Sequence, residues 1–222
     1  MYIRNDYKLI FIHIPKTAGN SITTALKALP EKHPLSNNKT IKKNNLIRNN
    51  LKNRKGKLEK HAKALKIKKV VGNFIWSRYF CFGVVRNPWD IMVSTYFWWI
   101  EKSIKWKKFD NIRKKIEKMS GFDEFLLSEY GKNKINGIKT DMWDYITNKR
   151  GKIILDYIAK FENINDDWKK ICHRIGINHY KLNVLNTSQF REKDYRKYYT
   201  KKTRTLVENN FSNIIRVFDY KF

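Results

Sequence analysis

Residues 8–21 read KLIFIHIPKTAGNS, and this stretch decides the fold. Its first part, residues 8–14, is rich in β-branched and aromatic side chains, which predicts a short buried strand. The loop PKTAGNS follows at once. A helix is expected from Gly19, because apolar residues then recur at helical spacing until Pro30, which must end it. The stretch therefore predicts a strand, a tight loop and a helix in that order.

A second stretch, residues 79–85 (YFCFGVV), repeats this order. It predicts a strand, after which Asn87 can cap a helix that has Pro88 at its first position. Strands that alternate with helices favour an α/β fold. We expect a three-layer, P-loop-like domain whose central, mainly parallel sheet is flanked by helices. Ligands bind such sheets at the carboxyl ends of the strands, where both loops would lie. One domain over residues 1–222 fits the chain length.

The remaining segments are less distinctive. Residues 36–60 are dominated by Lys, Asn and Arg and predict a mobile basic loop. A basic amphipathic helix is expected over 103–118, and a turn followed by a strand over 151–163. Residues 166–175 alternate faces as a helix should. The tail from Thr200 predicts one packing helix, because its apolar residues form a single stripe.

The composition limits the function classes. Of 222 residues, 41% are hydrophobic, which suffices for one substantial core, and the formal net charge is +28. Such a charge attracts polyanions, namely nucleic acids, acidic glycans or an anionic membrane surface. Alternatively, it reflects a drift of exposed positions toward Lys and Asn codons in an AT-rich genome.

Cysteines and apolar runs are both scarce. Only two cysteines occur, Cys81 and Cys172, so neither a disulfide framework nor a cysteine metal site is predicted, and no other cluster has metal-ligand spacing. No apolar run approaches the roughly 20 residues that span a bilayer. The first residues show no signal-peptide cleavage site. We therefore expect a cytoplasmic protein with no transmembrane segment and no metal.

The loop PKTAGNS predicts an anion site. Between a strand and a helix, successive backbone N–H groups and the helix dipole face one point. Lys16 precedes the only glycine, so the order of a Walker A loop is missing and ATP or GTP hydrolysis loses its main support. The alternative is a purely structural turn. The residues of this predicted anion loop are Lys16, Thr17, Ala18, Gly19, Asn20 and Ser21.

A second anion site is predicted after the second strand. Arg86 ends that strand, and Ser94 lies about two turns into the following helix. A guanidinium with a nearby hydroxyl suits a terminal phosphate, which offers several acceptor oxygens. The alternative is an Arg86 that only pairs with Asp90 at the helix start.

Taken together, the two stretches resemble the sulfotransferase superfamily, most closely the carbohydrate branch that includes heparan sulfate 2-O-sulfotransferase. FIHIPKTAGNSI resembles the loop that binds the donor's 5′-phosphosulfate, and VVRNPWDIMVSTY resembles the motif that holds its 3′-phosphate. Residues 144–177 and 195–222 are similar to further family segments, so most of the chain is covered. Departures include Asn20, where Thr is common, and Lys160, where Arg is usual.

The resemblance implies transfer of a sulfuryl group from 3′-phosphoadenosine-5′-phosphosulfate (PAPS) to a hydroxyl, by in-line displacement and without a metal. The implied acceptor is a carbohydrate, with an anionic glycan as one candidate. Lys16 matches the residue that stabilises the leaving phosphate oxygen, and Arg86 and Ser94 match the 3′-phosphate ligands. His61 resembles the family's histidine upstream of the second motif and is the candidate general base, since an imidazole pKa of about 6.5 suits the task. A surface histidine is the alternative, with Glu59 as a weaker substitute.

Other assignments are less specific. Residues 186–191 resemble a loop that closes over the nucleotide, in which Ser188 and Arg191 would reach the 3′-phosphate; a solvated turn is the alternative. The aromatic residues 96–99 either line the core or offer a stacking face for adenine or a sugar. Two further functions stay open: a basic protein that binds nucleic acid, although no reader motif is present, and an inactive sulfotransferase-like protein that binds a nucleotide or glycan.

Overall fold

Two compact units make up the described part of the chain. The structure is a computed structural model, and it describes residues 1–32, 58–131, 134–135, 138–139, 141–178, 181–183, 188 and 190–222. Unit 1 contains Met1–Ile14, Ala18–Val85 and Asp144–Val184, and unit 2 contains Pro15–Thr17, Arg86–Trp143 and Leu185–Phe222. The expectation of a single domain over residues 1–222 stays a prediction. Most of the basic loop predicted at 36–60 lies outside the described residues.

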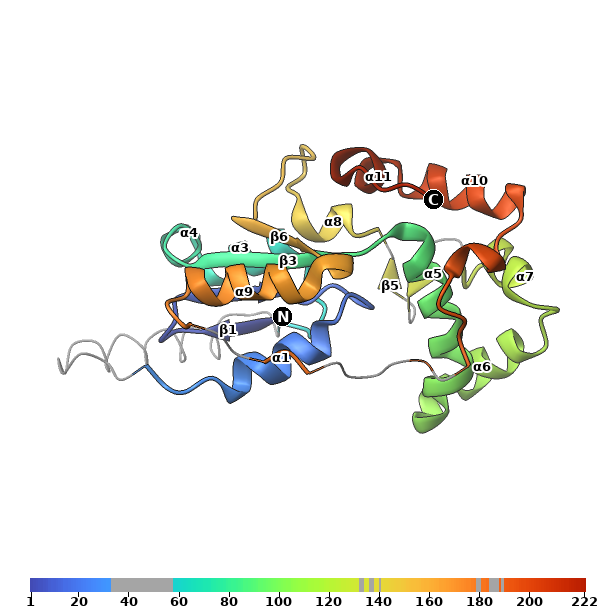
Figure 1. Cartoon of the computed structure of the whole chain (residues 1–222), viewed down its shortest axis with the longest axis horizontal. Helices are drawn as coiled ribbons and strands as arrows, with labels where there is room; N and C mark the ends of the chain where they lie inside the picture. Colours follow the sequence, from blue (N-terminus) through green and yellow to red (C-terminus); the bar gives the residue numbers. More distant parts are fainter. Residues whose placement is uncertain are drawn as a thin grey trace. The chain divides into compact units, whose positions relative to one another are not determined.

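Unit 1 is built on a mixed four-stranded sheet with the strand order β1-β2-β3-β6 (Figure 1). The strands are β1 (Tyr2–Arg4), β2 (Leu9–Ile12), β3 (Phe80–Val85) and β6 (Tyr157–Lys160). β2, β3 and β6 run parallel, whereas β1 pairs with β2 in the antiparallel direction. The parallel centre confirms the predicted α/β class. The antiparallel edge strand β1 is not among the elements that the sequence predicts.

Helices cover both faces of this sheet. They are α1 (Gly19–Ala28), α3 (Ala64–Val71), α4 (Asn73–Trp76), α8 (Trp143–Ile146) and α9 (Ile164–Arg174), with a short 3-10 turn η4 (Phe161–Asn163). One face carries Phe11 and Phe82, whose rings stack 5.0 Å apart, and packs against α1 and α9. The opposite face carries Cys81, whose Sγ lies 3.9 Å from the carbonyl oxygen of Trp76 in α4. This is the predicted three-layer arrangement.

Unit 2 is mainly helical. Its helix α5 (Pro88–Phe97) starts where the sequence predicts, because the side chain of Asn87 accepts hydrogen bonds from the N–H groups of Trp89 and Asp90. The other elements are the π-helix η1 (Trp98–Lys102), the 3-10 helices η2 (Ser103–Lys105), η3 (Lys107–Phe109) and η5 (Tyr195–Tyr198), the helices α6 (Asp110–Glu117), α7 (Phe122–Leu127), α10 (Lys201–Asn210) and α11 (Ser212–Phe218), and the paired strands β4 (Lys134–Ile135) and β5 (Ile138–Lys139).

Two helices predicted as continuous are interrupted. The basic helix expected over 103–118 is divided into η2, η3 and α6, since the backbone at Trp106 is extended. The single C-terminal helix expected from Thr200 begins there, capped by the Thr200 side chain, but it ends before Phe211, after which α11 begins. Each break lies at a packed aromatic ring: Trp106 stacks on Trp98, and Phe211 is buried. Tertiary packing of these rings therefore overrides the local helical pattern.

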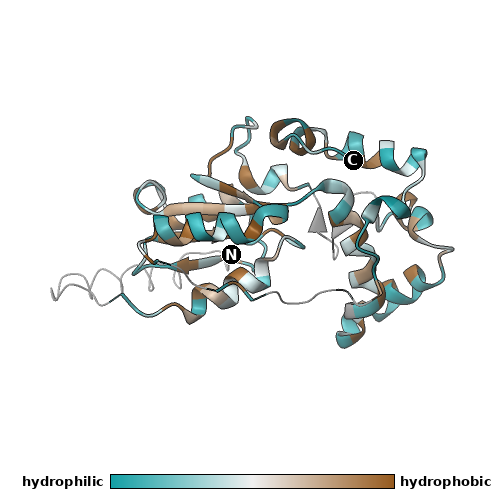
Figure 2. Ribbon diagram, viewed as in Figure 1, coloured by the Kyte–Doolittle hydropathy of each residue, from teal (hydrophilic) through white to brown (hydrophobic). Residues whose placement is uncertain are grey.

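Helix α9 of unit 1 and helix α10 of unit 2 are amphipathic. In Figure 2, α9 and α10 each carry hydrophilic residues in teal and hydrophobic residues in brown, as expected of helices with one buried side. In α9 the buried side includes Trp168, Ile171 and Cys172. Among the described helices, none combines the length and the apolar character that crossing a membrane requires.

Candidate functional site

The predicted anion loop follows β2 and leads into α1. Two of its residues have left-handed backbones although neither is glycine, since φ is 64° at Lys16 and 61° at Ala18. Such residues in a turn can direct successive N–H groups to one side, which is the geometry of backbone anion sites. Ala18 is also the N-cap of α1, and no side chain caps this helix. An uncapped helix N-terminus after such a turn is a suitable place for an anion.

The side chains of the loop differ in their exposure. Thr17 is fully buried and Ser21 nearly so, whereas Lys16 is half-buried. Asn20 is exposed, and its Oδ1 accepts a hydrogen bond of 2.8 Å from the Lys60 ammonium. The hydroxyl groups that the sequence assigns to anion binding therefore lie inside the fold, and Asn20 lies at the surface.

Gly19 is required by the neighbouring His13. A Cβ atom at Gly19 would lie 2.1 Å from Cδ2 and from Nε2 of His13, so no larger residue fits unless the imidazole moves. His13 is buried, and burial, with a smaller contribution from His61, lowers its pKa to about 2. His13 is therefore neutral and packs against the start of α1.

The predicted base, His61, lies beside His13 in unit 1. Its Nδ1 is 2.9 Å from the carbonyl oxygen of His13, and the two ring centroids are 4.7 Å apart. Because a carbonyl oxygen can only accept, Nδ1 carries the proton, and Nε2 is the basic nitrogen of the neutral ring. Burial lowers the pKa of His61 below its ordinary value of 6.5, against the opposing effect of the hydrogen bond to His13. His61 is thus held at the end of β2 from which the loop departs.

Arg86 is the centre of a hydrogen-bond cluster in unit 2. Its Nε donates to Asp90 at 2.6 Å, and its Nη1 donates to the carbonyl oxygen of Lys16 at 2.9 Å and to Oγ of Ser94 at 3.3 Å. The structure therefore shows both the Asp90 pair and the predicted neighbourhood of Arg86 and Ser94. The bond to Lys16 also brings the two predicted motifs into direct contact.

Asp90 also pairs with Arg191, so one carboxylate holds two guanidinium groups. The three side chains are only 9% to 13% exposed. Burial, and secondarily repulsion by Arg86, lowers the pKa of Arg191 to about 10, which leaves it charged at neutral pH. Nε of Arg191 is buried and has no acceptor among the described residues. The cluster therefore has one excess positive charge and an unsatisfied donor, which is a suitable arrangement for an anion.

The role of Asp90 was missed at the sequence level, where it was weighed only as an alternative partner of Arg86. The available signal was its spacing, because residues four apart meet on one helix side. The segment before Arg191 is attached to unit 2 by Glu101, whose carboxylate accepts from the Ser188 hydroxyl and, at 3.3 Å, from the N–H of Phe190. The structure thus brings Arg191, but not Ser188, into the Arg86 cluster. Residues 186, 187 and 189 lie outside the described part of the chain.

The aromatic residues 96–99 divide between core and surface. Phe97 and Trp99 are buried, whereas Trp98 is half-buried and its ring centroid lies 6.0 Å from Nζ of Lys16. A cation at that distance over an indole is attracted by the ring. Lys16 and Trp98 lie far apart in the chain, so no local sequence pattern predicts their contact.

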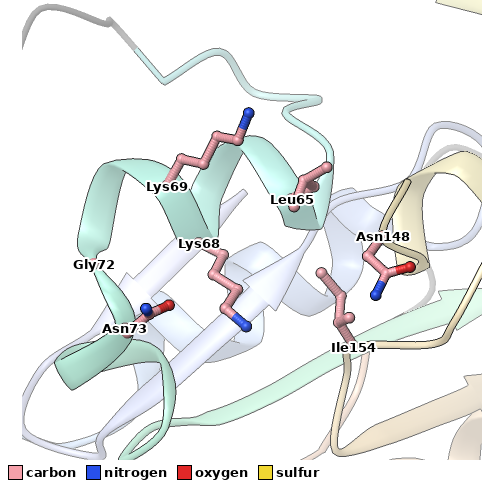
Figure 3. A pocket seen from close by; sticks show the side chains of 7 residues that line it. All are labelled: Leu65, Lys68, Lys69, Gly72, Asn73, Asn148 and Ile154. Atoms are coloured by element: carbon pink, nitrogen blue, oxygen red, sulfur yellow. The ribbon is translucent and has the colours of Figure 1, made fainter. Parts of the chain in front are cut away.

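Two cavities in unit 1 are formed by other residues. One has a volume of about 460 Å³. In Figure 3, Lys68 reaches into it from α3 toward the side of Asn148 and Ile154, whereas Lys69 points away. A second cavity, of about 670 Å³, is lined by residues that include Phe80 and Arg174. None of the predicted site residues lines either cavity.

The described residues contain no cluster of three or more His, Cys, Asp or Glu side chains that would suit a metal ion. Cys81 and Cys172 are both buried as free thiols. Burial also raises the pKa of the Cys81 thiol to about 12, so this thiol is protonated at neutral pH. Neither cysteine has the character of a reactive group.

Comparison with known proteins settles the family. The model of the sulfotransferase family matches residues 1–220. This chain belongs to the sulfotransferase family. The sulfotransferase is also similar to an uncharacterized protein of Archaeoglobus fulgidus, with 31% identity over 111 residues, which are 50% of this chain and 79% of that protein. No solved structure matches it.

The imidazoles of His13 and His61 should both be mainly in the neutral form at pH 6.5, because burial lowers the pKa of each below that of an exposed histidine. Long-range proton–nitrogen NMR of the labelled protein measures this, with a His61→Gln variant to assign the signals. His61 should show a protonated Nδ1 and a bare Nε2, with a titration midpoint below 6.5. A midpoint above 6.5 would contradict the burial of the His61 ring, and a neutral ring protonated at Nε2 would contradict its hydrogen bond to His13.

Proposed function

We propose that this sulfotransferase moves a sulfuryl group from PAPS to a hydroxyl group of a carbohydrate. The observation that carries the proposal is the hydrogen bond of 2.9 Å from Arg86 to the carbonyl oxygen of Lys16. PAPS carries anionic groups at its 5′ and 3′ positions, so its protein ligands must form two anion sites on one molecule. The contact between the motifs supports a single nucleotide held by both.

The proposed donor site assigns one group of residues to each end of PAPS. The 5′-phosphosulfate lies on the anion loop, residues 16–21, where backbone N–H groups and the Lys16 ammonium neutralise its charge. The 3′-phosphate lies against Arg86, Ser94 and Arg191. The buried Nε–H of Arg191, which lacks an acceptor among the described residues, supports this assignment because a phosphate oxygen would supply one. In the proposal Ser188 exchanges its bond to Glu101 for the phosphate.

The proposed reaction is an in-line displacement at sulfur. The acceptor oxygen forms the new bond to sulfur, while the bond from sulfur to the bridging oxygen breaks and its electron pair leaves on adenosine 3′,5′-bisphosphate (PAP). Lys16 stabilises the negative charge that develops on this oxygen. Nε2 of His61 accepts the proton of the acceptor hydroxyl, for which a neutral ring with its Nδ1 already protonated is suited. The proposed mechanism uses no metal.

The carbohydrate acceptor rests on the resemblance to the carbohydrate branch and on the net charge of +28, which favours an acidic glycan. The same charge motivates the alternative of a nucleic-acid-binding protein. The match to the sulfotransferase family over residues 1–220 favours the enzyme. Tight duplex binding that persists at about 150 mM salt, without any sulfate transfer, would favour the alternative.

Lys16→Ala and Arg86→Ala should impair transfer in different ways. With labelled PAPS and a glycan panel, Lys16→Ala should lower kcat by about a hundredfold or more, because the leaving oxygen loses its cation. Arg86→Ala should raise the donor KM by about ten- to a hundredfold, since it removes charged hydrogen bonds to the nucleotide. Lys202→Ala, at an exposed lysine of α10, is the matched control and should behave as the wild type. Wild-type rates in both site variants would refute the assignment.

His61→Ala should slow the chemical step. Single-turnover transfer should fall by about 10² to 10⁴, the usual contribution of a general base. The affinity for PAP should change little, because the proposed role of His61 concerns the acceptor proton only. Glu59→Gln serves as the control for the weaker candidate, and melting curves show whether either variant disturbs the fold. Unaltered single-turnover rates in His61→Ala would assign the base elsewhere.

A further inference from the structure

An aromatic platform, formed by Trp98, Trp106 and Phe109, extends from Lys16 in unit 2. Nζ of Lys16 lies 6.0 Å from the ring centroid of Trp98, and Trp98 stacks on Trp106 with centroids 5.7 Å apart and planes inclined by 26°. Phe109 meets Trp98 and Trp106 edge-on, at 5.7 and 6.5 Å. A single indole therefore separates the outer ring, Trp106, from the ammonium group of the anion loop.

The platform is fixed by the helix that carries the Arg86 cluster. Asp90, Ser94 and Trp98 are spaced four residues apart, so they follow one another along the same side of α5 and η1. Asp90 and Ser94 contact Arg86, and Trp98 contacts Lys16. The orientation of the platform is thus tied to that of the proposed donor site.

The outer part of the platform is exposed. Trp106 is 44% exposed, and its neighbour Ile104 is 58% exposed. Large apolar side chains that gather at the surface beside a binding site often mark a ligand groove. The backbone at Trp106 is extended where the basic segment is interrupted between η2 and η3, and the Trp106 ring lies on Trp98. The exposed indole is therefore held in place by its ring contacts with Trp98 and Phe109.

Lysine residues adjoin Trp106 in the sequence on both sides. Lys105, Lys107 and Lys108 flank Trp106 and are all exposed. Lys108 lies 4.9 Å from the ring centroid of Phe109, and neither Lys105 nor Lys107 has an acidic partner among the described residues. A flat apolar face with unneutralised positive charge at its edges is complementary to a ring that has a nonpolar face and anionic substituents.

We propose that the aromatic platform is the acceptor subsite, on which a pyranose ring of an acidic glycan stacks against Trp106 while its carboxylate or sulfate groups pair with Lys105 and Lys107. This inference rests on the proposed function and names its acceptor class. The C–H groups on one face of a pyranose pack on an indole, as other apolar groups do on aromatic rings. The open position of Trp106 suits an extended chain, whereas a small phenol would need an enclosing pocket. The next sugar along the glycan then presents its hydroxyl toward Lys16.

The test separates acceptor recognition from donor recognition. Trp106→Ala should raise the KM for an acidic glycosaminoglycan octasaccharide by about five- to tenfold, whereas Trp106→Phe should retain most of the affinity, because it keeps an aromatic face. The KM for PAPS and the Kd for PAP should stay at wild-type values in both. Phe74→Ala is the matched control: Phe74 is also an exposed aromatic residue beneath a cation, Arg78, but it belongs to unit 1. The double variant Lys105→Ala/Lys107→Ala should bind the acidic octasaccharide more weakly. Its affinity for a neutral oligosaccharide of the same length should not change.

Direct binding of the octasaccharide without donor distinguishes the possible failures. A wild type that binds no PAP and transfers no sulfate would refute the proposed function, and the platform would still be judged by whether Trp106→Ala loses octasaccharide binding. If Trp106→Ala transfers sulfate with an unchanged acceptor KM and binds the octasaccharide as the wild type does, the proposed acceptor subsite is refuted and the proposed function is not. If Trp106→Ala raised the KM for phenolic acceptors but not for glycans, this result would also overturn the proposal, in favour of a small aromatic acceptor.

Discussion

The carboxylate of Asp90 holds two guanidinium groups, those of Arg86 and Arg191, in a nearly buried cluster. Burying three charges with one positive in excess is costly unless a further negative charge arrives. The lowered pKa of Arg191 is a sign of this cost, because both its burial and the charge of Arg86 disfavour its protonated form. The cluster orients Arg86 so that it also reaches the backbone of Lys16 and the hydroxyl of Ser94. The proposed donor site and the aromatic platform both depend on this arrangement.

A second constraint acts at the end of β2. His13 is packed so closely against Gly19 that no Cβ atom fits there, and its carbonyl oxygen accepts a hydrogen bond from His61. The neutral state of His13 avoids a buried charge beside the start of α1, where the helix dipole is already positive. These contacts fix the direction in which the chain enters the anion loop. They also select the tautomer of His61 that can accept a proton at Nε2.

The fold could be predicted from local patterns where the pattern and the packing agree. The strand at β2, the start of α1 at Gly19 and the Asn87 cap of α5 follow from periodicity and capping residues, and the structure has them at the expected places. The breaks at Trp106 and Phe211 could not be predicted, because they occur at aromatic rings whose tertiary contacts the local pattern does not reveal.

In the site, too, some contacts follow from local sequence spacing and others arise only from the tertiary fold. The pairing of Arg86 with Ser94 follows from helical spacing, whereas the meeting of Asp90 with Arg191 and of Lys16 with Trp98 joins residues far apart in the chain. The roles of the site residues remain proposals. Their contacts are what the structure adds to the sequence.

The most direct measurement is the affinity of the protein for PAP and for 5′-AMP, two nucleotides that differ by the 3′-phosphate alone. If the Arg86 cluster receives that phosphate, titration calorimetry should give PAP an affinity about a hundredfold or more above that of 5′-AMP, since several charged hydrogen bonds are at stake. Equal affinities for the two nucleotides, or no binding of either, would contradict the account.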